Sequence, residues 1–222
     1  MIDLTLVIPA KNESESLPNV LKELEKFNVK KIVVMSEDDL ETFNSIKRYN
    51  ETIVYQKGKG FGNALRTGIH SVKTKFFCVF NADGSFDPKD LAHLRKKLLD
   101  GADFVFSSRY LRHGGSDDDT VLTYIGNFFF TSLCNILFKL KISDVLYTYV
   151  MGSTEAFKSL DMKYDDFSFC VELPIKAKKK NFTLTDNPSF ERSRIGGFKK
   201  VNEFRDGFLI LISIFKLLIF HK

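Results

Sequence analysis

The sequence predicts an α/β fold with a doubly wound, mostly parallel sheet, helices on both faces of that sheet, and a C-terminal amphipathic or interfacial helix. Three observations predict it. In the first half, short apolar runs alternate with segments whose apolar side chains recur every three or four positions, and such alternation favours parallel strands. Polar residues follow the ends of the apolar runs. A further apolar stretch, residues 208–220, lies at the end of the chain.

The first half supplies five strands and four helices. Leu4–Pro9 is an apolar run that ends at a proline, and residues 14–27 follow with leucines at helical spacing and Ser14 as the expected N-cap. The same reasoning predicts strands at 30–35, 52–55, 76–80 and 102–107, and helices at 38–48, 61–72 and 87–99, the last opened by Pro88.

Residues 120–138 carry no charge over 19 positions, which is long enough for a membrane-spanning helix. However, polar residues recur within it at spacings of three or four: Asn127, Thr131, Ser132 and Asn135. This polar stripe favours an amphipathic helix that packs on the domain or lies at a membrane surface. Beyond it we expect a strand at 148–152, a helix at 169–180 and a strand at 182–185.

The last apolar run, residues 208–220, is 13 residues long and contains one lysine. That is short for the hydrocarbon core of a bilayer, which is roughly 30 Å thick. The run fits a helix in the membrane interface, with Arg205, Lys216 and Lys222 near anionic head groups. It fits a C-terminal helix docked on the core equally well.

Length and composition fit one domain, or one domain with an appendage: the chain has 222 residues, 44% of them hydrophobic and 27% charged. The first nine residues contain no basic n-region and no cleavage site, so we expect no secretory signal. Cys78, Cys134 and Cys170 lie far apart among apolar neighbours. They predict reduced core thiols in a cytosolic protein.

The net charge is +5, and part of the excess gathers around Gly196-Gly197, where five cationic residues lie between positions 192 and 205. A basic loop that contains glycine suits phosphate groups better than it suits a helix. Nucleic acid is the rival anion. The sequence has no recognised nucleic-acid-binding motif and its basic cluster is confined to the C-terminal part, so we expect no nucleic-acid partner.

The stretch VFNADGSFDP, residues 79–88, follows a predicted buried strand. Asn81 and Asp83 are two positions apart, so their side chains point the same way. Mg²⁺ accepts carboxylate and amide oxygens when water and substrate phosphate complete its ligands. With the hydroxyl of Ser85, the two residues predict a divalent-metal site. An Asx-rich turn without a metal fits the same ten residues.

The stretch GKGFGNALRTG, residues 58–68, is neither G-x-G-x-x-G nor a Walker loop. It fits a flexible turn that leads into a helix. It also fits a loop whose backbone amides, with Lys57 and Lys59, approach a diphosphate.

Taken together and in order, VIPAKNESESL, KGKGFGNALRTGI, FNADGSFDP and SSRY resemble the family 2 glycosyltransferases of GT-A fold. Within that family the chain is most similar to the polyprenyl-phosphate (dolichol-phosphate) mannosyl- and glucosyltransferases. The likeness continues through Asp144, FSFCVELPIKAKKKNF and FERSRIGGFKK. It implies a GT-A domain over residues 1–202. Residues 203–222 then form a C-terminal hydrophobic helix, for which association with a membrane and docking on the core both stay open.

The resemblance implies roles for individual residues. The metal would be Mg²⁺ or Mn²⁺, held by Asn81, Asp83 and Ser85, with Asp83 the key carboxylate between the ion and the diphosphate. The nucleotide sugar, a GDP- or UDP-sugar, would contact a larger set. That set comprises Pro9, Lys11, Glu13, Glu37, Lys59, Asn81, Asp83, Arg109, Arg194 and Lys200. The catalytic set would comprise Asp83, Arg109, Asp144 and Glu172.

Three departures from the family pattern bear on these roles. Asn81 stands where an aspartate is common, which predicts weaker metal binding. Asp144 is followed by Val-Leu-Tyr-Thr-Tyr rather than by a Ser-Gly-Phe turn, which predicts a different pocket floor. The second strand ends in Met-Ser-Glu-Asp-Asp, so Glu37, Asp38 and Asp39 all stay candidates for contact with the base or ribose.

The expected reaction is an inverting sugar transfer to a polyprenyl phosphate at the cytoplasmic face of a membrane. The protein itself would be cytoplasmic and peripheral to the inner membrane. A cation at Asp83, with Arg194 and Lys200, would stabilise the negative charge of the leaving diphosphate. Arg109 would hold the lipid phosphate bidentately. An alternative is transfer to a sugar hydroxyl of a cell-surface glycan or lipid, with Glu172 or Asp144 as general base. A second is a non-catalytic nucleotide-sugar-binding remnant.

Overall fold

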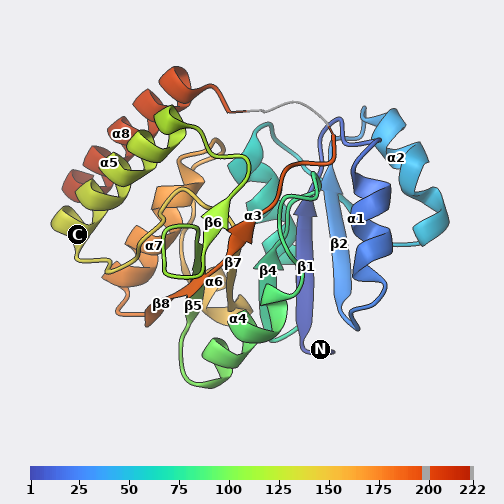
Figure 1. Ribbon diagram of the computed structural model, residues 1–222, viewed down its shortest axis with the longest axis horizontal. Helices are drawn as coiled ribbons and strands as arrows, with labels where there is room; N and C mark the ends of the chain where they lie inside the picture. Colours follow the sequence, from blue (N-terminus) through green and yellow to red (C-terminus); the bar gives the residue numbers. More distant parts are fainter. Residues whose placement is uncertain (197–200, 221–222) are drawn as a thin grey trace.

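A computed structural model of the chain describes residues 1–196 and 201–220. Seven strands form one sheet in the order β3-β2-β1-β4-β7-β5-β8, and Figure 1 labels the row from β2 to β8. Their bounds are β1 Leu4–Pro9, β2 Lys30–Met35, β3 Thr52–Tyr55, β4 Phe76–Val79, β5 Phe104–Ser108, β7 Val150–Ser153 and β8 Leu184–Pro188. A separate pair joins β6, Gly115–Ser116, to β9, Phe190–Glu191.

The sheet is mostly parallel, as the alternating sequence predicts. β1 pairs in parallel with β2 and β4, β2 with β3, and β5 with β8. β7 is the exception, because it runs antiparallel to both of its neighbours, β4 and β5. Periodicity predicts a strand in this region but not its direction, which depends on the path of the chain before it.

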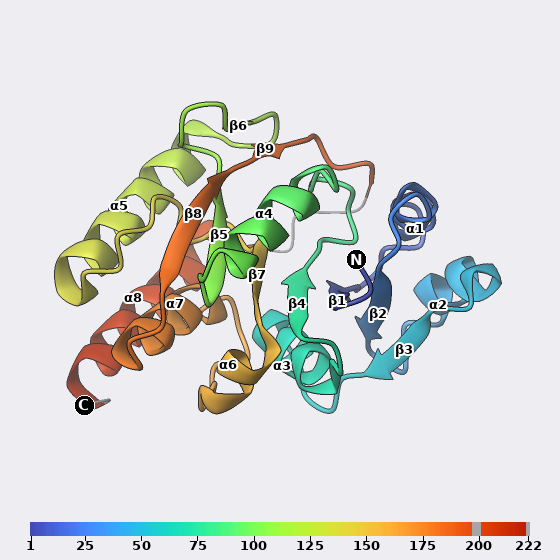
Figure 2. The same ribbon diagram turned by 90° about the horizontal axis from the view of Figure 1, so that it is seen from below.

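Helices cover both faces of the sheet, as Figure 2 shows. α1 (Leu17–Leu24), α2 (Leu40–Ile46) and α4 (Asp90–Leu99) contribute to the apolar core on one face. α3 (Phe61–Ser71), α6 (Thr154–Ser159) and α7 (Phe169–Lys179) contribute to the core on the other. The apolar residues of β2, β4 and β5 alternate between these two cores, so both faces of the central strands are buried.

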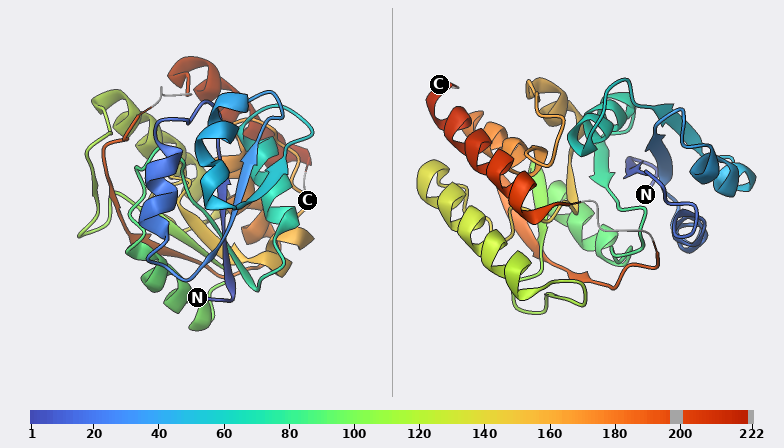
Figure 3. Two further views of the ribbon diagram at one scale, coloured as in Figure 1. Left: turned by 90° about the vertical axis from the view of Figure 1, so that its right-hand side faces the viewer. Right: turned by 90° about the horizontal axis from the view of Figure 1, so that it is seen from above.

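Two long helices lie side by side outside α7, on the face that Figure 3 shows from above. α5 spans Val121–Phe138 and α8 spans Glu203–Phe220. α8 buries Ile210, Ile214 and Leu217 in the same core as α7. Of the helices in the described part of the chain, only α5 is long and apolar enough to cross a membrane, and that criterion of length and composition is weak evidence by itself.

Several predicted helix ends were wrong by two or three residues. Ser14 is not the N-cap: α1 begins at Leu17 with Pro18 in its first turn, where a missing N–H costs nothing, and the Ser14 hydroxyl donates to Glu41 instead. Helix α4 begins at Asp90 rather than at residue 87, because Asp87 caps a turn by accepting a hydrogen bond from the Lys89 amide (3.0 Å).

Candidate active site

The predicted metal-binding loop directly follows β4. The Asp83 carboxylate accepts hydrogen bonds through Oδ1 from the Ser85 amide (3.0 Å) and the Ser85 hydroxyl (2.7 Å). The Asn81 amide nitrogen lies 3.4 Å from the same hydroxyl. Gly84 has φ +85°, a left-handed conformation that a residue with a side chain rarely adopts. The sequence placed these three side chains together correctly because they belong to one short loop.

The oxygens of this loop suit a hard divalent cation. Asp83 Oδ2 and Asn81 Oδ1 make no hydrogen bond or ion pair within residues 1–196 and 201–220, and both residues are partly exposed. The same described residues contain no cluster of three or more His, Cys, Asp or Glu side chains that could hold a metal. A cation here would therefore have one carboxylate, one amide oxygen and the oxygens of a bound substrate.

The C-terminal strap, residues 192–195, lies directly on the metal-binding loop. The Arg192 amide donates to the Ser85 carbonyl and the Ile195 amide to the Asp83 carbonyl, both at 2.8 Å. The Ile195 side chain covers Gly84, so closely that a Cβ on Gly84 would lie 2.5 Å from its Cδ1 atom. Figure 1 shows this segment crossing from β8 toward β1. Folding thus brings together two segments about a hundred residues apart.

Arg194 lies beside the metal-binding loop. Its guanidinium donates to Asp118 (2.6 Å), and this bond, with the nearby charges of Asp83 and Glu191, raises the pKa of Arg194. A permanent cation therefore stands near the Asp83 carboxylate, as expected for a diphosphate site. Lys200, the other predicted cation of this loop, lies outside the described residues.

Arg109 is engaged by carboxylates, contrary to the expectation that it holds a phosphate bidentately. Its Nε and Nη2 atoms donate to Asp144 (2.8 and 3.0 Å) and its Nη1 to Glu191 (3.1 Å). The rings of Tyr110 and Tyr147 lie 5.2 and 4.7 Å from its guanidinium carbon. Burial opposes the charge, but the two carboxylates outweigh it and raise the pKa of Arg109. All three guanidinium nitrogens thus have acidic partners in this structure.

Asp144 is completely buried and held from several sides. Besides the guanidinium, the Arg109 amide donates to it (3.1 Å). The chain around it is tied to α5, where Asn127 and Thr131 accept hydrogen bonds from the Leu146 and Val145 amides, both at 3.1 Å. The polar stripe of the sequence is therefore the inward face of α5. Asp144 is the partner of a buried cation rather than a base open to a substrate.

Glu172 is a structural residue in this fold, so the prediction of a general base there is corrected. It is completely buried, accepts the Lys163 and Tyr164 amides (2.7 and 2.9 Å) and pairs with Lys176 (2.8 Å). Both carboxylate oxygens are thereby occupied. It lies at the start of α7, where an acidic residue also complements the helix dipole.

The segment that Glu172 holds supports the glycine loop before α3. The backbone N–H of Asn63 donates to the Asp165 carbonyl (3.1 Å). The Asp165 carboxylate contacts Arg66 and accepts a hydrogen bond from the side-chain Nδ2 of Asn63 (3.0 Å). Added Cβ atoms on Gly60 and Gly62 would lie 2.2 and 2.4 Å from backbone oxygens of this segment. These two glycines are therefore needed for packing within the protein.

The three acidic candidates in the loop after β2, Glu37, Asp38 and Asp39, have different surroundings. Asp39 caps α2 and accepts the Asn12 amide (2.7 Å), so it shapes the first loop. Asp38 is exposed; a hydrogen bond from Ser36, and then the charges of Lys59 and Lys11, lower its pKa. Glu37 is exposed.

The remaining predicted residues of the first loop differ in exposure. Pro9 ends β1 and Lys11 is exposed, whereas Glu13 is buried and accepts a hydrogen bond from the Ser16 hydroxyl (2.6 Å). The charges of Lys11 and Lys59 both act on Asp38, and the three residues follow the carboxyl ends of β1, β3 and β2, where ligands bind in such sheets.

Sequence reasoning missed two acidic residues of the site, Asp118 and Glu191. Asp118 belongs to the run Asp117-Asp118-Asp119, and Glu191 precedes the basic cluster. Both act as partners of arginines that the sequence did identify. The acidic run was the only local signal, and it did not specify which arginine each acid meets.

Comparisons with known proteins bear on the family and the fold. Residues 5–161 match the family model described as glycosyl transferase family 2. A protein of Methanocaldococcus jannaschii is 29% identical over 194 residues, 84% of this chain and 80% of the relative. The UDP-N-acetylglucosamine–dolichyl-phosphate N-acetylglucosaminyltransferase of Methanococcus voltae is 23% identical over 208 residues, 82% of this chain and 83% of the relative.

A solved structure supports the fold independently. Glucosyl-3-phosphoglycerate synthase of Mycobacterium tuberculosis, in complex with Mn²⁺, uridine diphosphate and glucosyl-3-phosphoglycerate, superposes with a TM-score of 0.77 at 15% identity, covering 98% of this chain and 80% of that one. The GT-A fold inferred from the motifs is confirmed. Because the family model covers well over half of its length, the chain belongs to glycosyl transferase family 2 and is a glycosyltransferase with a nucleotide-sugar donor.

Proposed function

We propose that this protein transfers a sugar from a GDP- or UDP-sugar to a polyprenyl phosphate, with inversion at the anomeric carbon. The observation that carries the proposal is a pair of oxygens, Asp83 Oδ2 and Asn81 Oδ1, that make no hydrogen bond or ion pair with residues 1–196 or 201–220 and lie beside Arg194 at the carboxyl ends of the central strands. The relative from Methanococcus voltae, named for transfer to dolichyl phosphate, supports this acceptor class.

The donor side of the mechanism follows from charge. A Mg²⁺ or Mn²⁺ ion at Asp83 and Asn81 would neutralise the diphosphate when bound. Arg194, fixed by Asp118, stands where it can stabilise the negative charge that grows on the leaving oxygen. Lys11 and Lys59, at the neighbouring strand ends, supply further positive charge for the nucleotide.

The state of the candidate bases supports a phosphate acceptor. Transfer to a sugar hydroxyl needs a group that removes a proton, but Asp144 and Glu172 both belong to buried ion pairs. A lipid phosphate is already anionic and attacks without a general base. The Arg109–Asp144–Glu191 cluster then serves to shape the acceptor side of the site, with Arg109 as a buried positive centre.

We further propose that the protein acts at the cytoplasmic face of a membrane, as a peripheral protein. The long apolar tail of a polyprenyl phosphate stays in the bilayer, so an enzyme that uses it must reach the membrane surface. The exposed apolar side chains of α5 and α8 support contact with a membrane surface.

A transfer assay tests the proposal. Radiolabelled GDP- and UDP-sugars are incubated with Mn²⁺ or Mg²⁺ and either a polyprenyl phosphate or a glycan acceptor, and label is counted in the lipid and aqueous phases. We expect label in the lipid phase, lost about a hundredfold or more in Asp83→Asn. Asp87→Asn is the matched control, because Asp87 lies four residues on and caps a turn.

Three outcomes would contradict the proposal. Label only in the glycan would assign a hydroxyl acceptor. No transfer with any donor, and no gain from Asn81→Asp, would identify a binding remnant. Full activity of Asp83→Asn would remove the predicted role of the metal site.

A further inference from the structure

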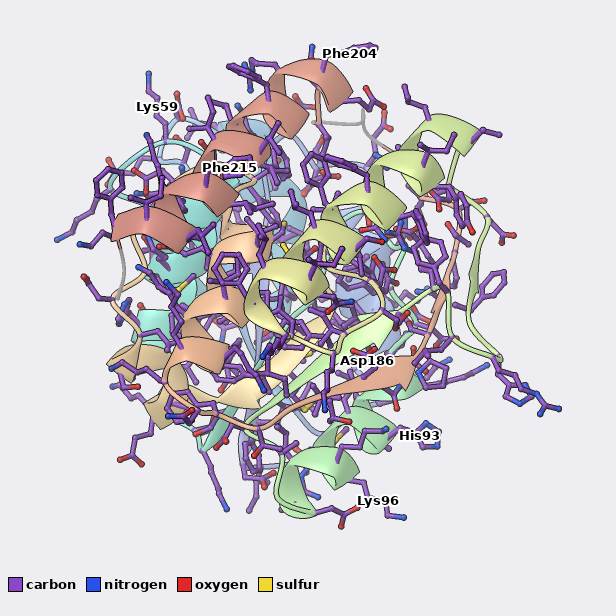
Figure 4. All side chains as sticks on the ribbon, turned by 90° about the vertical axis from the view of Figure 1, so that its left-hand side faces the viewer. Lys59, His93, Lys96, Asp186, Phe204 and Phe215 are labelled. Atoms are coloured by element: carbon purple, nitrogen blue, oxygen red, sulfur yellow. The ribbon has the colours of Figure 1, made fainter. Side chains whose placement is uncertain are left out.

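The exposed apolar side chains of the protein gather on one face. Nineteen large hydrophobic residues of the described chain are exposed, and thirteen of them lie on α5 and α8. Figure 4 looks at this face and labels Phe204 and Phe215 on α8. The set on α5 is Val121, Leu122, Tyr124, Ile125, Phe128, Phe129 and Ile136, and the set on α8 is Phe204, Phe208, Phe215, Leu218, Ile219 and Phe220. A monomeric soluble protein rarely leaves such a patch uncovered.

The two helices form one continuous surface. α5 and α8 contact each other as well as α7, and Phe130 of α5 packs close to Gly207 of α8. Figure 3 shows the two helices side by side along this edge of the molecule. We call their exposed faces together the α5–α8 platform.

α5 has two faces with different tasks. Its inward stripe, Asn127, Thr131 and Asn135, bonds to the backbone of residues 142–146 at 2.8–3.3 Å. These bonds hold the helix along the domain surface, so it cannot cross a bilayer without breaking them. Its outward face carries Phe128 and Ile136, which are 66% and 75% exposed. A helix of this kind fits the plane of a membrane interface.

The charges at one end of the platform select an anionic surface. Lys139 and Lys141 follow α5, and Lys216 lies in the last turns of α8; all three are exposed. None of the three has an ion pair with an acid in the described chain. Lys180, at the end of α7, is also exposed. Apolar side chains beside uncompensated lysines match the interface of a bilayer with anionic head groups.

We propose that the α5–α8 platform docks on an anionic lipid monolayer, with both helices lying in the interface. The inference rests on the proposed function and adds the surface that delivers the acceptor. The start of α5 adjoins the site, because Asp119 contacts Thr123 in its first turn while Asp118 holds Arg194. A lipid phosphate in the docked membrane therefore lies next to the residues that handle the donor.

Vesicle binding of the full chain tests the platform. The protein is floated with vesicles of phosphatidylcholine alone and with vesicles of equal parts phosphatidylcholine and phosphatidylglycerol. We expect binding to the anionic vesicles only. The double variants Phe128→Ser/Ile136→Ser and Phe208→Ser/Ile219→Ser should each lose most of it, because all four side chains are exposed and apolar. Lys139→Glu/Lys141→Glu should weaken binding by roughly fivefold or more per lysine.

Matched controls come from the rest of the surface. Leu40 and Ile2 are as exposed as the platform residues, at 64% and 77%, and Lys96 is an exposed lysine on α4. Ile2→Ser/Leu40→Ser and Lys96→Glu should bind anionic vesicles like the parent protein. Hydrolysis of the nucleotide sugar in water, without lipid, should be unchanged in every platform variant, because none of these residues contacts the metal-binding loop.

Several results would overturn the inference. Equal binding by platform and control variants would place the lipid contact elsewhere. Absence of binding to both kinds of vesicle would remove it. Concentration-dependent dimers in sedimentation, dissolved by the Phe128→Ser/Ile136→Ser variant, would make a second copy the occupant. Absence of nucleotide-sugar hydrolysis in the parent protein would instead count against the proposed function. Failure of the platform inference and failure of the proposed function are therefore distinguishable.

Discussion

The role of Glu172 gives the sharpest test of the structure, because a general base and a buried brace respond differently to Glu172→Gln. Glutamine keeps the size of the side chain but offers one accepting oxygen where the carboxylate offers two. The Lys163 and Tyr164 amides both need an acceptor. The nitrogen of the new amide group would face one of these donors, and Lys176, with 9% of its side chain exposed, would lose its counter-ion.

The magnitude follows from that loss. Removal of one partner of a buried ion pair lowers the free energy of unfolding by about 3–5 kcal/mol. We count the cost of the unsatisfied backbone amide as part of that range. For a chain of this length each kcal/mol lowers Tm by about 2–4 °C, so Glu172→Gln should lower Tm by roughly 6–20 °C. A protein with ordinary stability survives this and stays folded at room temperature.

Thermal unfolding followed by circular dichroism measures the effect. Glu155→Gln is the control, since Glu155 is an exposed glutamate at the start of α6 and its change should stay within about 0.5 kcal/mol. Glu172→Gln/Lys176→Met, which removes both charges, should recover part of the loss. A Tm equal to that of the parent, together with loss of sugar transfer, would refute the brace and restore the general base.

Three further predictions follow from other parts of the site. Asn81→Asp adds a second carboxylate beside Asp83 and should tighten Mn²⁺ binding by about tenfold or more, measured by manganese titration; unchanged affinity would mean that this side chain does not face the ion. Gly62→Ala should cost about 1–3 kcal/mol in urea unfolding, because its Cβ would lie 2.4 Å from the Tyr164 carbonyl oxygen. Gly126→Ala on α5, with no atom within 4 Å of the new Cβ, should be neutral or stabilising; equal losses would argue against the packing role. His70 is an exposed residue, but partial desolvation of its ring, and then the charges of Lys158 and Arg66, lower the pKa of His70 below 6.5. The unfolded chain therefore binds this proton first, and stability should fall as the pH drops through 6.5. His70→Gln should flatten the slope, and an unaltered slope would assign it to other groups.

The sequence predicted most of the sheet and the grouping of polar side chains in the loop after β4, since both depend on local patterns. Periodicity within five to ten residues indicates each strand and helix, and Asn81, Asp83 and Ser85 belong to one turn after one strand. The same reasoning did not anticipate the antiparallel direction of β7 or the short pair of β6 and β9. Strand direction and pairing depend on how distant segments meet, and two-residue strands have no period to read.

Partnerships across the chain explain the predicted roles that changed. Arg109 and Asp144 are 35 residues apart, and Arg194 and Asp118 are 76 apart. No spacing in the sequence predicts that the first pair is buried or that the second fixes a cation beside Asp83. The glycine loop was ambiguous for a similar reason, because the backbone oxygens that exclude side chains at Gly60 and Gly62 come from residues about a hundred positions away.

The sequence by itself determined the alternation of strands and helices, the polar residues at the strand ends and the group of side-chain oxygens in the loop after β4, because each depends on neighbours in the chain. Only the tertiary structure decided which charged groups are free and which are paired. A carboxylate that faces a buried cation, as in Asp144 and Glu172, loses the chemistry that an open one would have. That difference arises from burial and distance, which exist only once the chain is folded.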